Sequence, residues 1–94
     1  MATFVMLGKY SPQALQQMSA DRTSKAVDKL KQFGGNVRSM WATLGSQDLV
    51  FIVDFPDNAA AVKASVALGK MTGIAFTTSP AVSVEEFDKL TAGL

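Results

Sequence analysis

Apolar residues recur along the chain with two different periods, and each period predicts a different kind of element. Short apolar runs bounded by turn residues predict four strands, at residues 3–9, 37–44, 48–55 and 73–79. Apolar residues at helical spacing predict a first helix from Pro12 to Phe33, with a kink near Ser19. Two further helical stretches begin after Pro56 and after Val82. The elements therefore follow the order β-α-β-β-α-β, with one more helix at the end.

Residues that prefer helix ends mark where these helices begin and stop. Serine, aspartate and asparagine side chains accept hydrogen bonds from the first N–H groups of a helix, and glycine readily adopts the left-handed conformation that ends one. The expected caps are Ser11 with Pro12, Asp21 after the kink, Asp57 or Asn58, and Ser83 with Glu86, and the expected stop is Gly34-Gly35. One side of the second long helix carries Val62, Ser65, Val66 and Gly69, and the last helix carries Val84, Phe87, Leu90 and Leu94 as an apolar stripe.

The element order is that of the ferredoxin-like α+β fold. In this fold two helices cover one face of a four-stranded antiparallel sheet, and Gly45-Ser46-Gln47 is expected to join the second and third strands as a hairpin. No repeat or linker divides the chain, so residues 1–94 are expected to form one domain. The second face of the sheet is left to solvent, to a ligand or to a partner.

The third strand favours a covered second face, because Leu49-Val50-Phe51-Ile52-Val53 is apolar at every position. A strand that is wet on one face alternates apolar with polar residues. If Val5 and Leu7 face the helices, the open face holds Phe4, Met6, Phe51 and the Trp41 side of the hairpin. Monomers seldom expose an apolar patch of that size. We therefore expect a homodimer or higher homo-oligomer, packed sheet to sheet as a dimeric α+β barrel with a pocket in or beside the seam.

Composition narrows the classes of function. The chain has 48% hydrophobic and 18% charged residues, against about 25% charged in an average soluble domain, which fits a surface partly covered by another subunit. A formal net charge of +1 creates no field that would attract nucleic acid. With no cysteine or histidine, no metal or cofactor is expected. Residues 1–9 carry no cationic leader and no membrane-spanning run, which favours a cytoplasmic protein that does not interact with membranes.

Aromatic residues expected near the open face are candidates for a binding site. Such sites are mostly apolar with a few polar anchors. The residues that could line a pocket for a flat organic ligand are Tyr10, Trp41, Phe51 and Met6, with Thr43 as the anchor. These residues, together with Phe4, could equally form a dimer core. We favour the interface, because aromatic residues and methionine are enriched at subunit contacts.

Charged side chains offer weaker candidates. Asp48, Asp54 and Asp57 could bind a divalent cation or supply a general base, but turns and helix caps use aspartate for local hydrogen bonds. Lys9 and Arg38 could bind an anionic group, although strand ends in solvent commonly carry such charges. No histidine is present to activate a serine or threonine hydroxyl, so no catalytic residue is assigned.

Several positions resemble the GYD family, small bacterial proteins named after a Gly-Tyr-Asp signature in the turn after the second strand. The matching residues are Lys9-Tyr10, Arg22, Gly34-Gly35, Leu44-Gly45 with Asp48, Pro56-Asp57 and Glu86-Phe87. Gln47 stands where we expect the tyrosine of the signature. The resemblance implies a ferredoxin-like fold of the dimeric α+β barrel type, and it implies no reaction.

These observations favour a small homo-oligomeric binding or assembly protein, with the sheet-to-sheet seam as the place for a small apolar or aromatic ligand. The alternative is a cofactor-independent enzyme, such as an isomerase or monooxygenase, by analogy with other dimeric α+β barrels. A ligand-sensing regulatory module is a third hypothesis. A titratable group in a cavity would favour the enzyme.

Overall fold

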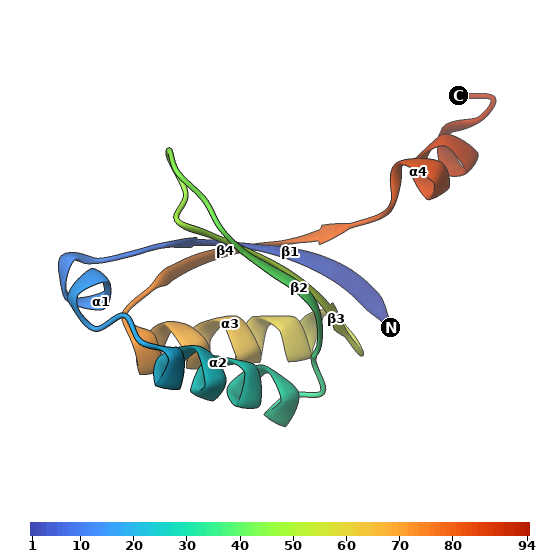
Figure 1. Cartoon of the computed structure of the whole chain (residues 1–94). Helices are drawn as coiled ribbons and strands as arrows, with labels where there is room; N and C mark the ends of the chain where they lie inside the picture. The colour runs from blue at the N-terminus through green and yellow to red at the C-terminus, as the bar shows by residue number, and fades with distance from the viewer.

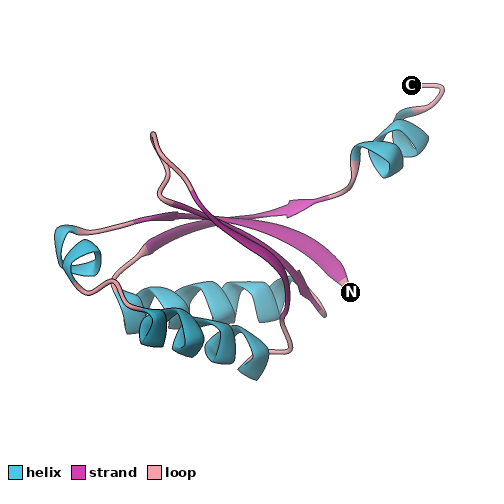
Figure 2. Cartoon of the chain, viewed as in Figure 1, coloured by secondary structure: helices cyan, strands magenta, loops and turns pink.

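A four-stranded antiparallel sheet with two helices on one of its faces forms the body of the molecule (Figure 1). The computed structural model describes residues 1–94. The elements are β1 (Ala2–Lys9), α1 (Pro12–Gln16), α2 (Ala20–Gln32), β2 (Asn36–Ala42), β3 (Leu49–Phe55), α3 (Asn58–Thr72), β4 (Ala75–Ala81) and α4 (Val84–Thr91). The strands lie in the order β2-β3-β1-β4, so β1 and β3 are central. The predicted α+β, ferredoxin-like architecture is confirmed, and Figure 2 distinguishes its helices and strands by colour.

Most helix ends follow the expected capping chemistry. The serine or aspartate side chains that accept a hydrogen bond from the first turn of a helix are Ser11, Ser19, Asp57 and Ser83. The expected kink is a full break between α1 and α2. Ser19 rather than Asp21 caps α2, because the new helix starts two residues earlier than expected, and Asp21 lies in its first turn. Gly34 follows α2 with φ of +82°, the left-handed conformation that a stop requires.

The expected assignment of the two sheet faces is wrong by one residue. Phe4, Met6 and Phe51 lie in the core under α2 and α3, where Met6 is 0% exposed. Val5 and Leu7, expected under the helices, lie on the open face and are half-buried. Successive strand residues alternate between faces, so the sequence tells which residues share a face. When both alternating sets are apolar, it does not tell which set the helices cover.

A β-bulge in β2 changes which of its residues face the core. Val37 is opposite Val53 and Ser39 is opposite Ile52, so one additional residue, Arg38, lies between the two pairs. Val37 therefore packs against the core, while Trp41 lies on the open face and is 62% exposed. Without the bulge, both would be on the same face.

Helix α3 packs through small residues rather than through its valines. Its buried residues are Ala61, Ala64, Leu68 and Thr72. Val62 and Val66, on the side marked by the sequence, are exposed. Because α3 is apolar almost all round, periodicity did not distinguish its sides. Alanine allows the helix backbone to approach the sheet closely, which fits the alanine side being the buried one.

Helix α4 stands clear of the sheet and of the other helices, on the side of the sheet opposite α2 and α3 (Figure 1). None of its residues is buried, and the stripe formed by Val84, Phe87 and Leu90 is exposed. No helix in the chain combines the length and hydrophobicity that crossing a bilayer requires.

Candidate functional site

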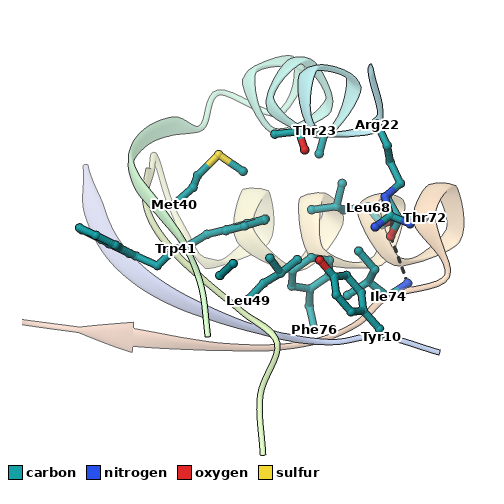
Figure 3. A pocket seen from close by; sticks show the side chains of 13 residues that line it. Tyr10, Arg22, Thr23, Met40, Trp41, Leu49, Leu68, Thr72, Ile74 and Phe76 are labelled. Carbon is teal, nitrogen blue, oxygen red and sulfur yellow. Dashed lines mark hydrogen bonds between the residues drawn. The ribbon is translucent and has the colours of Figure 1, made fainter. Parts of the chain in front are cut away.

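A cavity of about 220 Å³ lies between α2, α3 and the sheet, at the end of the core where β1 leads into α1 (Figure 3). Ten of its 13 lining residues are hydrophobic. The lining consists of Tyr10, Arg22, Thr23, Ala26, Met40, Trp41, Ala42, Leu49, Phe51, Leu68, Thr72, Ile74 and Phe76. We call this the α2 cavity. It has the composition of a small-molecule site, apolar walls with few polar groups.

The fold brings these residues together because one end of each main element meets here. β1 and β2 end at this side of the sheet, and β3 and β4 begin here. Helix α2 begins above it, while α3 ends beside it. Arg22, Ala26 and Leu30 are spaced by four residues, so they follow one face of α2, and that face carries the buried residues of the helix. Arg22 therefore lies on the same face of α2 as the buried Ala26 and Leu30, at the edge of the cavity.

Two of the polar side chains in the wall form hydrogen bonds with the backbone of their own helices or of the next residues. The Thr72 hydroxyl donates to the carbonyl of Leu68 at 2.8 Å and accepts from the N–H of Ile74 at 3.1 Å, the contact drawn as a dashed line in Figure 3. The Thr23 hydroxyl donates to the carbonyl of Ser19 at 3.3 Å. The groups left to meet a ligand are therefore the guanidinium of Arg22 and the phenol of Tyr10.

The Arg22 guanidinium lies over the Tyr10 ring, with 5.5 Å between its central carbon and the ring centroid. This is cation–π geometry. One terminal nitrogen of Arg22 also donates to the carbonyl of Ala14 in α1. Arg22 takes part in none of the four ion pairs of the protein. The cavity therefore has a fixed cation at one end that has no carboxylate partner.

Asp48 holds Tyr10 in place from the hairpin. Its carboxylate accepts a hydrogen bond from the Tyr10 backbone N–H at 2.8 Å, and its own N–H donates to the carbonyl of Gly8 at 2.8 Å. Lys9 lies 3.8 Å from the same carboxylate oxygen. These bonds fit the structural interpretation of Asp48 that the sequence favoured, but they join the hairpin to the end of β1 instead of being local to the turn.

Replacing Asp48 with alanine is expected to lower the free energy of unfolding by about 1–3 kcal/mol, because the half-buried Tyr10 N–H loses its partner. Urea denaturation followed by circular dichroism measures the change. Asp28→Ala, on the exposed side of α2, is the control and should change stability by no more than about 0.5 kcal/mol. Equal losses in both variants would contradict a role for this hydrogen bond.

The six residues proposed from the sequence occupy different places. Tyr10 and Phe51 line the α2 cavity, and Trp41 borders it from β2. The Trp41 ring itself points away from the cavity, toward the open face (Figure 3). Met6 is fully buried in the core and Phe4 borders a second, more open cavity, so neither reaches the open face. Thr43 is in the hairpin loop, where its hydroxyl donates to the carbonyl of Gln47 at 2.7 Å.

Sequence reasoning named Arg22 only as a matching position and missed its place in a cavity. The available signal was its spacing from Ala26 and Leu30, which puts an arginine on the buried face of α2. The three aspartates do not converge on a common point: Asp48 bonds to Tyr10, Asp57 caps α3, and Asp54 accepts from the Thr3 hydroxyl at 2.7 Å. Arg38 lies 3.9 Å from Asp54, so its charge has a partner.

The second cavity, of about 360 Å³, lies between α3 and the edge strand β4. Its polar centre is a hydrogen bond of 2.7 Å between the hydroxyls of Ser65 and Thr78. No charged side chain lines it. It offers less to orient a ligand than the α2 cavity does.

Comparison with known proteins identifies a family and shows a similar fold. The family model described as the GYD domain matches residues 4–91. No curated protein matches the chain. Among solved structures, the leucine response regulatory protein of Mycobacterium tuberculosis is similar with a TM-score of 0.58 and 10% sequence identity. The similarity covers 87% of this chain and 51% of that one, so the chain spans about half the length of the regulator. At this identity the likeness concerns the fold alone.

Proposed function

This chain belongs to the GYD domain family, and we propose that it acts as a homo-oligomeric module that binds a small, mainly apolar molecule. Two copies pack through the open faces of their sheets, and the α2 cavity of each copy holds the ligand. The apolar open face supports the proposed assembly. The α2 cavity, with its single unpaired cation, supports the proposed ligand binding.

The open face has the residues of an interface core. Leu7, Val50 and Trp41 are aligned across three neighbouring strands, and Val5 and Ile52 form the next pair of the same face. All five are apolar and none is buried within its own protomer. Burial of apolar surface is the main favourable term in association. A second copy provides a matching surface, since two-fold contacts use the same patch on both subunits.

The position of α4 supports the same arrangement. The helix lies on the open-face side of the sheet, where the second copy would sit (Figure 1). An isolated helix of eight residues is marginal in water, so its apolar stripe needs a surface to pack against. In the proposed assembly that surface belongs to the second copy.

Replacing Phe87 and Leu90 together with serine is expected to weaken self-association by about tenfold or more, because two large apolar side chains leave the interface. Sedimentation equilibrium measures the dissociation constant. Asp88→Asn, on the same helix, is the control and should leave association unchanged. A double variant that assembles like the natural protein would show that α4 stays outside the contact.

The α2 cavity lies on the helix-covered side of the sheet, whereas the sequence suggested a pocket in or beside the seam. Its titratable side chains are Tyr10 and Arg22. No carboxylate or lysine lines the cavity, which favours ligand binding over the proton transfers that an isomerase performs. A site of this kind selects its ligand by shape and by contact with the two polar groups.

Two measurements test the proposal. Native mass spectrometry at low micromolar concentration is expected to give a homodimer or a larger homo-oligomer, and a purely monomeric protein would contradict the assembly. A melting-temperature screen against small organic metabolites tests binding. A ligand at about 100 times its Kd adds about 2.7 kcal/mol to stability, which raises the melting temperature of a domain of this size by roughly 10–20 °C. Turnover of such a ligand would favour the enzyme instead.

A further inference from the structure

We infer that the α2 cavity takes a small organic carboxylate, a molecule with an apolar body and one anionic end, and that Arg22 binds its carboxylate group. This inference rests on the proposed small-molecule binding and names the chemical class of the ligand. The feature that carries it is the placement of an unpaired guanidinium at the end of an apolar cavity.

The charge of Arg22 is not balanced by its neighbours. Asp21, next to it in the chain, pairs with Lys25 at 3.1 Å on the exposed side of α2. Asp48, the carboxylate bonded to the Tyr10 backbone, has Lys9 as its cation. The end of the cavity therefore keeps a net positive charge. Arg22 is half-buried, and a nearby anion stabilises a half-buried cation. A ligand with a negative charge can supply that anion.

Arg22 is also held in a position suited to a carboxylate. A guanidinium has five N–H donors in a planar fork, and one of them bonds to the carbonyl of Ala14. The contact with the Tyr10 ring, 5.5 Å from the central carbon of the guanidinium, restricts the group further. Donors remain for a carboxylate, which arginine binds through two parallel hydrogen bonds. Because the side chain is already ordered, binding loses little rotamer entropy.

The rest of the cavity sets the size and character of the ligand. Figure 3 shows Met40 on the opposite side of the cavity from Arg22 and Tyr10, with Leu49 and Leu68 between them. The volume of about 220 Å³ is below the range of roughly 300–1,000 Å³ that is common for drug-sized ligands. A single ring or a short branched chain that carries one carboxylate fits these dimensions.

A purely structural role is the competing explanation for Arg22. Its bond to Ala14 links α2 to α1, and an arginine that only joined two helices would need nothing more. Joining the two helices requires only one N–H donor of the guanidinium. It does not require the Arg22 side chain to line an apolar cavity. The two explanations differ in what happens when a carboxylate is added.

Binding of matched acids and amides tests the inference. The probes are benzoate with benzamide, and isovalerate with isovaleramide, measured by isothermal titration calorimetry on the full chain at neutral pH. Each acid is expected to bind about 10- to 100-fold more tightly than its amide, because its hydrogen bonds to Arg22 are charge-assisted. Arg22→Met should remove this preference, because it weakens binding of each acid much more than binding of its amide. Arg22→Lys should keep part of it.

Lys25→Met is the matched control, since it removes a positive charge from the exposed side of the same helix. The chain has two arginines, so the side-chain Nε–Hε signals of Arg22 and Arg38 can be followed separately by NMR. Benzoate is expected to shift the Arg22 signal and not the Arg38 signal. This readout holds even if Arg22→Met fails to fold.

Four results would overturn the inference. Equal affinity for each acid and its amide would show that the cavity binds small molecules without selecting an anion, so the proposed function would stand alone. A preference for acids that survives Arg22→Met, or an Arg22 signal that benzoate does not move, would assign the anion to another residue. Failure of all four probes at millimolar concentration would count against both the carboxylate and the α2 cavity as a binding site.

Discussion

Replacing Val50 with aspartate is expected to convert the proposed homo-oligomer into a folded monomer. Val50 lies on the open face between Leu7 of β1 and Trp41 of β2. In an isolated protomer the new carboxylate stays in water, so the fold survives. In the seam its charge is buried without a partner, which costs about 3–5 kcal/mol. Association is therefore expected to weaken by roughly 100-fold or more.

Size-exclusion chromatography with light scattering measures this change, and circular dichroism shows whether the protomer remains folded. Ser46→Asp, in the loop of the same hairpin, adds the same charge and should leave the assembly intact. Phe51→Asp has a different expected outcome. Its side chain is in the core, so this variant should unfold rather than dissociate. A Val50→Asp protein with the mass of the natural assembly would exclude the open face as the interface.

Replacing Phe55 with alanine is expected to lower the free energy of unfolding by about 3–5 kcal/mol. Phe55 is 0% exposed, and its ring meets that of Phe4 edge to face, with centroids 5.7 Å apart. A Cβ added at Gly35 would lie 2.8 Å from the Phe55 ring, which shows how tightly the backbone approaches it. Natural domains have a total stability of about 5–15 kcal/mol, so this single change removes a large part of it.

Phe87→Ala is the matched control for Phe55, because it removes the same side chain from an exposed position. Both changes are best made together with Val50→Asp, so that unfolding is measured on monomers. Phe87→Ala should then change stability by no more than about 0.5 kcal/mol. Chemical denaturation gives both values. Similar losses at the two positions would show that α4 packs against its own protomer.

The α2 cavity illustrates what a single sequence cannot give. Tyr10 follows β1 and Arg22 is in α2, and the turn through α1 brings the two side chains together. Their contact depends on the break between α1 and α2, which the sequence indicated only as a kink. The unpaired state of Arg22 depends in turn on where every nearby carboxylate finds its partner. Both are properties of the folded chain.

The sequence by itself determined the order of the elements, the hairpin, the caps of α1, α3 and α4, and the α+β class. Those features follow from local chemistry: Ser11, Asp57 and Ser83 bond to N–H groups only three residues away. Tertiary structure alone decided which face of the sheet the helices cover and which side of α3 is buried. Both faces and both sides are apolar in sequence, so the choice came from packing among distant segments rather than from any local pattern.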